Sequence, residues 1–281
     1  MLEVDINKLV NDNYHLGEYL PENIVIVGEI EIIYICYKYD KLDLFKVKCD
    51  KIYYYDQEGD SIENHILPNS LKILFCDGEK LTKIPKLPNS LKGLSCSCHK
   101  LTSLPDLPDS LEGLYCCYNK LTSFANTQLP NSLKELYCSG NKLTNIPQLS
   151  NSLIKLNCGL NKLTSIPKLP NLLQGLYCSG NQLTSLPNLP NSLKKLYCDH
   201  NQLISLPDFT HINHRLELSF IQDEPINYIP YNKNIKLYNE EDNRINIEGY
   251  PHNPITNQEE LDKYMDYIKN YKMNRIKSAR K

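Results

Sequence analysis

Residues 129–148 read LPNSLKELYCSGNKLTNIPQ, and this stretch decides the fold because it is one of seven near-copies in tandem. The spacing between successive copies is 20 residues, with one two-residue insertion in the third copy. Tandem units of about 20 residues are typical of a solenoid, in which each unit forms one coil and contacts only its neighbours. The copies begin at Leu67, Leu87, Leu107, Leu129, Leu149, Leu169 and Leu189.

Each unit has one set of apolar positions separated by polar or small residues. Around Leu136 and Cys138 these positions alternate with polar ones, which is the pattern of a short strand with one buried face. Strands of successive coils would then pair in parallel at a spacing of about 4.8 Å. We expect an inward-facing set in the fourth unit that consists of Leu133, Leu136, Cys138, Leu143, Ile146 and Leu149.

An asparagine follows the repeated cysteine by three residues in five units, where the chain must leave the strand. An amide both donates and accepts hydrogen bonds, so it can satisfy backbone groups that the turn leaves without partners. We predict a structural ladder of Asn119, Asn141, Asn161, Asn181 and Asn201. Glu79 and His99 replace this residue in the first two units, which suggests a looser N-terminal end.

The second half of each unit carries two closely spaced prolines, which exclude a long helix there. We therefore predict an α/β-type repeat solenoid that is mainly β, with short parallel strands on its concave face. The convex side should be extended or polyproline-like. A β-rich N-terminal cap and a C-terminal helix complete the predicted fold.

The chain divides into four predicted segments. Residues 1–66 contain alternating, strand-like runs and form the cap. Residues 67–208 hold the seven repeats, and residues 209–253 hold worn, degenerate copies. Residues 254–281 form an amphipathic helix, because Thr256 and Glu259 are spaced as a capping box, followed by a basic tail.

The repeat pattern resembles that of leucine-rich repeat proteins of the short, 20-residue subtype found in bacterial effectors, with Cys where that subtype often has Val. It also resembles uncharacterised repeat proteins of large amoeba-infecting DNA viruses. The resemblance implies a binding scaffold. Some effectors of this kind carry a C-terminal ubiquitin ligase with a cysteine nucleophile, but the last cysteine here is Cys198, inside the final repeat, so that activity is not carried over.

Composition narrows the possible environments and partners. The net charge of −2 gives no global attraction to nucleic acid or anionic membranes. Eleven cysteines, an odd number with seven in the repeats, favour reduced thiols over a disulfide framework. The N-terminus has no secretory signal pattern, so we expect a soluble protein of the cytoplasm, whether of its own cell or of a host cell, with no membrane partner. We expect a monomer.

The outward strand positions carry the candidate binding surface. The residue before each repeated cysteine faces away from the core, so in parallel register these residues form a row of mostly aromatic rings. Tyrosine gives a large contact area and is enriched in protein interfaces, although it also suits any strand surface. We predict that a partner contacts Phe75, Tyr115, Tyr118, Glu135, Tyr137, Lys155, Asn157, Tyr177, Lys195, Tyr197 and His200.

We find no catalytic constellation, phosphate-binding loop or metal motif, and we predict no cofactor. Zinc at Cys98, His99 and Cys117, or at the histidines near His211, is a weak alternative. The leading function is non-catalytic protein–protein interaction through the concave sheet. Two alternatives are nucleic-acid binding by the tyrosines with Lys72, Lys92, Lys134, Lys194 and Lys195, and an enzyme hidden in the N-terminal region.

Overall fold

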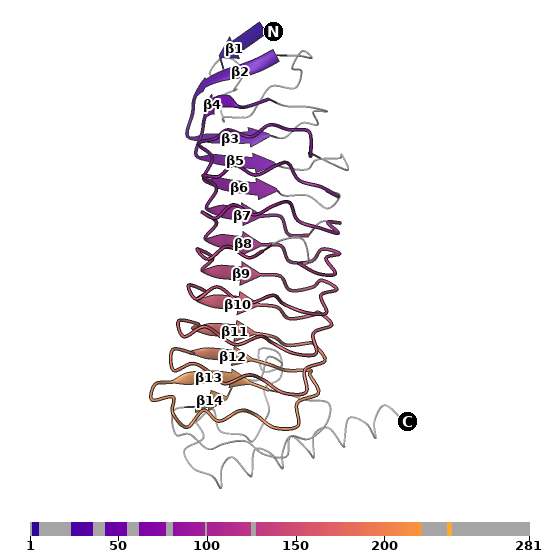
Figure 1. Cartoon of the computed structure of the whole chain (residues 1–281), viewed down its shortest axis with the longest axis vertical. Helices are drawn as coiled ribbons and strands as arrows, with labels where there is room; N and C mark the ends of the chain where they lie inside the picture. The colour runs from indigo at the N-terminus through magenta and orange to yellow at the C-terminus, as the bar shows by residue number, and fades with distance from the viewer. Residues whose placement is uncertain are drawn as a thin grey trace, which may run out of the picture.

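The protein is an elongated column of stacked coils, seen in a computed structural model of the chain (Figure 1). The structure describes residues 2–5, 24–35, 43–54, 62–76, 81–98, 100–124, 128–220 and 235–237. One short strand of each coil lies on the same side of the column, like the rungs of a ladder. The segments that return the chain between these strands contain no helix within the described residues.

The described strands form two parallel sheets. A small sheet has the order β1-β2-β4, and a sheet of 11 strands runs in the order β14-β13-β12-β11-β10-β9-β8-β7-β6-β5-β3. The strands are β1 (Leu2–Asp5), β2 (Ile24–Glu29), β3 (Ile32–Ile35), β4 (Lys46–Lys48), β5 (Lys51–Tyr54), β6 (Ile73–Cys76), β7 (Gly93–Ser95), β8 (Gly113–Tyr115), β9 (Glu135–Tyr137), β10 (Lys155–Asn157), β11 (Gly175–Tyr177), β12 (Lys195–Tyr197), β13 (Leu216–Ser219) and β14 (Ile235–Leu237).

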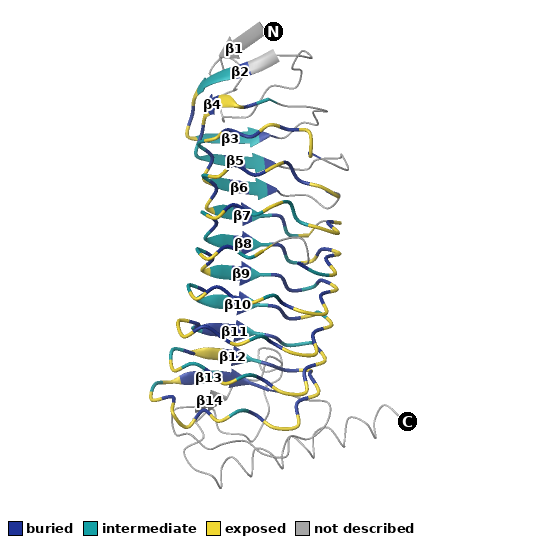
Figure 2. Cartoon of the chain, viewed as in Figure 1, coloured by how far each residue is buried: buried dark blue, intermediate teal, exposed yellow. Residues whose placement is uncertain are grey.

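The repeats stack with equivalent residues in register, so each side-chain type forms a row along the column. Leu114 pairs with Leu94 on one side and with Leu136 on the other. These leucines are fully buried, and the residues before and after them in the strand are partly exposed (Figure 2). The expected period of two is therefore confirmed: the leucines face the interior, and their strand neighbours form the outward face of the sheet.

The repeated cysteines form a buried row behind that face, as predicted. Cys76 is 4% exposed, and its six counterparts, Cys96, Cys116, Cys138, Cys158, Cys178 and Cys198, are completely buried. Burial raises the pKa of Cys96 and of Cys158 to about 12. These thiols therefore stay protonated at neutral pH and pack as small apolar groups.

Thiol labelling of the native protein should distinguish the accessible cysteines, Cys98 and Cys117, from the seven buried cysteines of the row. A maleimide at neutral pH should modify exposed Cys98 first and half-buried Cys117 more slowly, because only accessible thiolates react. The seven row cysteines should be labelled only after denaturation. Mass spectrometry of tryptic peptides over time measures this order, and labelling of Cys138 or Cys158 at the rate of Cys98 would contradict the buried row.

The predicted asparagine ladder is present and links each coil to the one before it. Asn141 Oδ1 accepts a hydrogen bond from the backbone N–H of Leu121 at 3.0 Å. Its Nδ2 donates to the backbone carbonyls of Cys116 at 3.0 Å and Cys138 at 3.1 Å. The same three contacts recur at Asn119, Asn161, Asn181 and Asn201. Glu79 and His99, where we predicted a looser end, lie outside the described residues.

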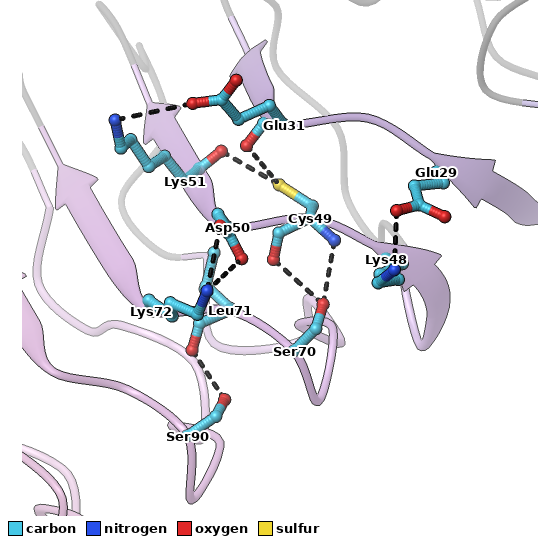
Figure 3. A network of polar contacts seen from close by, with 10 residues as sticks. All are labelled: Glu29, Glu31, Lys48, Cys49, Asp50, Lys51, Ser70, Leu71, Lys72 and Ser90. Carbon is cyan, nitrogen blue, oxygen red and sulfur yellow. Dashed lines mark hydrogen bonds and ion pairs between the residues drawn. The ribbon is translucent and has the colours of Figure 1, made fainter.

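A second polar ladder connects the turns before the strands. In the Pro-Asn-Ser-Leu turn that begins at Pro88, the Leu91 N–H donates to the Pro88 carbonyl at 3.1 Å. The Ser90 hydroxyl in this turn donates to the carbonyl of Leu71 in the preceding coil at 2.6 Å (Figure 3). Ser70 does the same one coil earlier, where it bonds to the backbone of Cys49. Serine at this position therefore bonds a backbone group of the preceding coil in addition to favouring the turn, although the sixth copy has Leu172 there.

The ordered sheet extends beyond the seven repeats at both ends. β5 pairs with β6 and β3 pairs with β5, so residues before Leu67 contribute to the same sheet. β13 and β14 continue it after Asp208, within the segment where we predicted degenerate copies. A role of residues 1–66 as a cap, and the segment boundaries, stay predictions. The predicted helix in residues 254–281 lies outside the described residues.

Candidate functional site

The outward face of the long sheet, called here the sheet face, carries a row of aromatic rings at the position before the core cysteine. The parallel register places Phe75 beside Ser95, Ser95 beside Tyr115, and Tyr115 beside Tyr137. Beyond them the row continues through Asn157, Tyr177 and Tyr197. All of these side chains are partly exposed. The structure therefore brings these predicted contact residues together in one line.

The row is longer than the sequence repeats suggest. Tyr34 of β3 and Tyr53 of β5 occupy the same position, and their ring centroids are 5.1 Å apart. Tyr53 in turn stacks on Phe75 at 4.6 Å with an interplanar angle of 7°. Neither tyrosine was among the predicted contact residues, because both precede the recognisable copies. The alternating pattern around them, and their spacing of 19 and 22 residues along the row, would have been the available signal.

Neighbouring rings in the row pack in different ways. Tyr115 and Tyr137 stack with centroids 5.1 Å apart and an interplanar angle of 25°. Tyr177 and Tyr197 are 5.2 Å apart but meet edge to face, at 80°. Both geometries are favourable for aromatic pairs. The packing holds the rings in place before any partner arrives, which lowers the entropy lost on binding.

Tyr115, Glu135 and Lys155 form a connected polar group beside the row. The Tyr115 hydroxyl donates to Glu135 Oε2, and Lys155 Nζ donates to Glu135 Oε1 at 2.9 Å. The hydrogen bond from Tyr115, and after it the one from Lys155, lowers the pKa of Glu135. Burial and the same hydrogen bond raise the pKa of Tyr115. Glu135 and Lys155, both predicted contact residues, therefore orient the ring of Tyr115.

The lysines along the edge of the sheet face are paired with acidic or amide groups. Lys92 and Lys134 both contact Glu112, at 3.2 and 2.6 Å. Hydrogen bonds from Lys134 and then Lys92 lower the pKa of that carboxyl. The remaining lysines considered for phosphate binding have partners as well: Lys72 with Asp50, Lys194 with Gln174, and Lys195 with Glu217. Much of their charge is thus neutralised locally.

A second row, at the turn edge of the sheet face, has left-handed backbone conformation. Its φ values are +64° at Cys98, +53° at Tyr118, +69° at Gly140, +50° at Leu160, +68° at Gly180 and +50° at His200. Tyr118 and His200, both predicted contact residues, belong to it. Tyr118 and Leu160 are 56% and 55% exposed. Such a conformation costs a residue with a side chain about 1–2 kcal/mol, so the repeats present these two exposed side chains at a cost in stability.

Large side chains in this row lie over the glycines of the next coil. A Cβ atom at Gly140 would be 2.5 Å from Cδ1 of Tyr118. A Cβ atom at Gly180 would be 2.8 Å from Cδ2 of Leu160. Tyr118 and His200 were predicted contact residues, but their left-handed backbone was not predicted. The glycines at the equivalent positions were the signal.

Substituting Gly140 by alanine should therefore destabilise the protein. The new Cβ meets the Tyr118 ring and stands on a left-handed backbone, so we expect the free energy of unfolding to fall by about 1–2 kcal/mol. The matched control is Gly93→Ala, whose Cβ would meet nothing closer than 3.7 Å and should leave stability unchanged or slightly higher. Urea denaturation measures both, and equal effects would contradict the strain at Gly140.

The described residues contain neither a candidate metal site nor a candidate membrane-spanning helix. They contain no group of three or more His, Cys, Asp or Glu side chains that could hold a metal ion. His99, one of the zinc ligands considered, lies outside them. The same described part of the chain has no helix of the length and hydropathy needed to cross a bilayer.

Comparisons with known proteins agree with this architecture. The family described as Leucine Rich repeats (2 copies) matches residues 109–151. No curated protein matches the chain in sequence. Among solved structures, YopM, a leucine-rich effector protein from Yersinia pestis, is 23% identical over 80% of this chain and 74% of its own, with a TM-score of 0.55. This identity shows a shared fold only.

Two further structures have lower structural similarity. YopM from Yersinia enterocolitica WA-314 is 24% identical over 78% of this chain, with a TM-score of 0.40, and the chain spans only 60% of its length. The leucine-rich repeat domain of a Shigella effector is 27% identical over 58% of this chain and 70% of its own, also with a TM-score of 0.40. Residues 109–151 therefore match the leucine-rich repeat family, and the stacked parallel strands form a solenoid of the fold seen in YopM.

Proposed function

We propose that the protein is a non-catalytic scaffold that binds a protein or peptide partner through the sheet face. The observation that carries this proposal is the row of partly exposed aromatic rings from Tyr34 to Tyr197, which pack in neighbouring pairs and are interrupted at Ser95 and Asn157. Aromatic rings held in place by their neighbours are the side chains that dominate binding energy at protein interfaces. The exposed side chains of Tyr118 and Leu160 at the turn edge extend the same surface.

The charge pattern of the sheet face favours a protein over a nucleic acid as the partner. Phosphate binding needs cations that are available to the backbone of the nucleic acid. Lys92 and Lys134 already share Glu112, and Lys195 is paired with Glu217. Competition from these carboxylates supports a partner that uses aromatic and apolar contacts with a mixed set of charges.

The finer sequence expectations remain part of this proposal. We assign the repeats to the short, 20-residue subtype because of their spacing and their return segments without helix. A resemblance to repeat proteins of amoeba-infecting viruses, a host protein as the partner, action in the cytoplasm and a monomeric state stay predictions from the sequence.

The test is capture of the partner by proximity labelling in the native cell, with two variants of the full chain. In the first variant, Tyr115, Tyr137, Tyr177 and Tyr197 are replaced by serine. In the control, four exposed residues from the same four coils but away from the row are replaced by serine: Lys120, Lys142, Gln182 and Gln202. Circular dichroism verifies that both variants are folded.

We expect the first variant to lose the proteins that the wild type and the control capture. Loss of several aromatic anchors should weaken binding by at least about 100-fold, because each commonly contributes more than 1 kcal/mol. If the folded tyrosine variant captures the same proteins as the wild type, the sheet face is not the binding surface.

A further inference from the structure

A hollow lies in the sheet face where the aromatic row is interrupted for the first time. Its volume is about 480 Å³. Gly93, Ser95 and Gly113 line it, together with Phe75 and Tyr115 on the two strands that flank β7. Gly93 and Ser95 of β7, which lie between the two flanking strands, have small side chains or none, so they leave the space between the rings unfilled.

The coil of β7 has a glycine over which an aromatic ring could lie, but it has no aromatic side chain of its own at the row position. β8 and β11 have the sequence Gly-Leu-Tyr, and in both the tyrosine ring lies over the glycine two residues before it. Cε2 of Tyr115 would be 3.1 Å from a Cβ atom added at Gly113. Cε2 of Tyr177 would be 3.0 Å from a Cβ atom added at Gly175. Gly93 keeps this glycine, but the residue that follows by two is Ser95. Only the side chain of Ile73 comes near Gly93, at 3.7 Å.

The spacing of the row fits one additional ring. Phe75 and Tyr115 are two strands apart, about 9.6 Å at the usual strand spacing. A ring midway between them would lie about 4.8 Å from each, within the range of about 4.5–7 Å that favours aromatic pairs. The stacked pairs on both sides have this spacing already, at 4.6 Å for Tyr53 with Phe75 and 5.1 Å for Tyr115 with Tyr137.

The second interruption of the row is different. Asn157 occupies that position, and its Oδ1 accepts a hydrogen bond from the Gly159 N–H at 3.3 Å. Lys155 on the same strand is held by Glu135. Asn157 does not line the hollow. A substitution at Asn157 therefore serves as a control for one at Ser95, because both positions interrupt the row but only Ser95 lines the hollow.

The rim of the hollow itself holds two lysines and two glutamates, and an excess of one positive charge arises only when Lys155, which pairs with Glu135 from outside the rim, is counted. Lys92, Lys134 and Glu112 all line it, and the two ammonium groups share the single carboxylate. Glu135, which also lines it, is neutralised by Lys155. An acidic group next to an inserted ring would join this shared ion pair, because two ammonium groups face the one carboxylate of Glu112.

We propose that this hollow binds an aromatic side chain of the protein partner, inserted between Phe75 and Tyr115, with an acidic residue beside it in the sequence of the partner. This inference rests on the proposed function and adds the class of side chain and its exact place. The ring completes the aromatic row, and the neighbouring carboxylate contacts Lys92 or Lys134.

The key variant is Ser95→Tyr, which fills the hollow from within. It places at position 95 the residue that six other coils have there, over a glycine that can accommodate the ring, so the protein should fold and be at least as stable as the wild type. The matched control is Asn157→Tyr, which fills the other interruption. Thermal denaturation of both variants verifies their stability.

The probe is the blocked dipeptide N-acetyl-Asp-Tyr-amide, titrated into the ¹⁵N-labelled full chain and followed by NMR. In the wild type and in Asn157→Tyr, we expect saturable chemical-shift changes of the Gly93, Ser95 and Gly113 amides. In Ser95→Tyr, the Gly93 and Gly113 amides should show no such changes. N-acetyl-Asp-Leu-amide should bind about two- to tenfold more weakly, since it lacks the stacking contribution. N-acetyl-Lys-Tyr-amide should also bind more weakly, and salt should reduce this difference.

Shifts that persist in folded Ser95→Tyr, equal binding of the leucine dipeptide, or no saturable shift in the wild type would each overturn the proposal. Capture in cells then separates it from the broader function. If the quadruple tyrosine variant loses the partner and Ser95→Tyr keeps it, the sheet face binds the partner but the hollow does not receive a ring. If neither variant loses the partner, the sheet face itself is wrong.

Discussion

Replacement of Asn141 by alanine should lower the free energy of unfolding by about 2–4 kcal/mol. The amide satisfies the Leu121 N–H and the carbonyls of Cys116 and Cys138, all in the buried interior. Alanine removes all three hydrogen bonds. Each buried backbone group that loses its hydrogen-bond partner lowers the free energy of unfolding by about 1–3 kcal/mol unless water reaches it. No other side chain in the coil has both the acceptor and the two donors in this arrangement.

Urea denaturation of the full chain measures this loss. The control is Asn145→Ala in the same coil, where the side chain is exposed and the change should be within about 0.5 kcal/mol. Equal stability of the two variants would show that the ladder is not required.

Asn141→Asp tests the donor side of the same ladder. The carboxylate keeps the acceptor for Leu121 but points its second oxygen at the Cys116 and Cys138 carbonyls, so the charged form is disfavoured and its folded pKa is raised. A carboxyl with a raised folded pKa destabilises the fold above that pKa, and the loss shrinks as the pH falls through it. The stability difference from wild type should therefore narrow on acidification, and a difference independent of pH would contradict the donor role.

Leu156→Ala should be equally damaging for a different reason. Leu156 is fully buried at the centre of β10, between Leu136 and Leu176 of the neighbouring strands. Truncating a core leucine removes apolar burial and leaves a cavity, which costs about 2–5 kcal/mol. Because each coil of a solenoid is stabilised by its neighbours, the change should also weaken the coupling between the two halves of the column.

Hydrogen exchange resolves where this loss occurs. Amides of β10 and its two neighbouring strands should exchange faster in Leu156→Ala, whereas those of β6 should change least. Lys162→Ala, an exposed substitution in the same coil, is the control and should leave exchange unchanged. A uniform increase over all strands would contradict a fold stabilised coil by coil.

The sequence was sufficient for the parts of the fold that repeat. The alternation around Leu136 and Cys138 defined the buried face, and the position of Asn141 defined the ladder, because a solenoid places equivalent residues of each copy in one row. Any requirement met once per coil therefore appears once per 20 residues. The row of Tyr115, Tyr137, Tyr177 and Tyr197 could be placed on the sheet face for the same reason.

Features that depend on contacts between different copies were not predictable in this way. The left-handed backbone at Tyr118 and Leu160 could not be predicted from those residue types, because only the glycines at the equivalent positions, Gly140 and Gly180, favour a positive φ. The ion pairs of Glu112 with Lys92 and Lys134 depend on which variable residues become neighbours. The contributions of Tyr34 and Tyr53 to the row lie in coils whose sequences have diverged from the repeat.

The sequence by itself determined the solenoid, its leucine and cysteine interior and its asparagine ladder, since these follow from one short pattern and the geometry of a strand. Only the tertiary structure decided how far the aromatic row extends, which lysines are neutralised, and that Gly93, Ser95 and Gly113 together form a hollow between Phe75 and Tyr115. These properties depend on distances between side chains of successive coils. Such distances exist only once the coils have stacked.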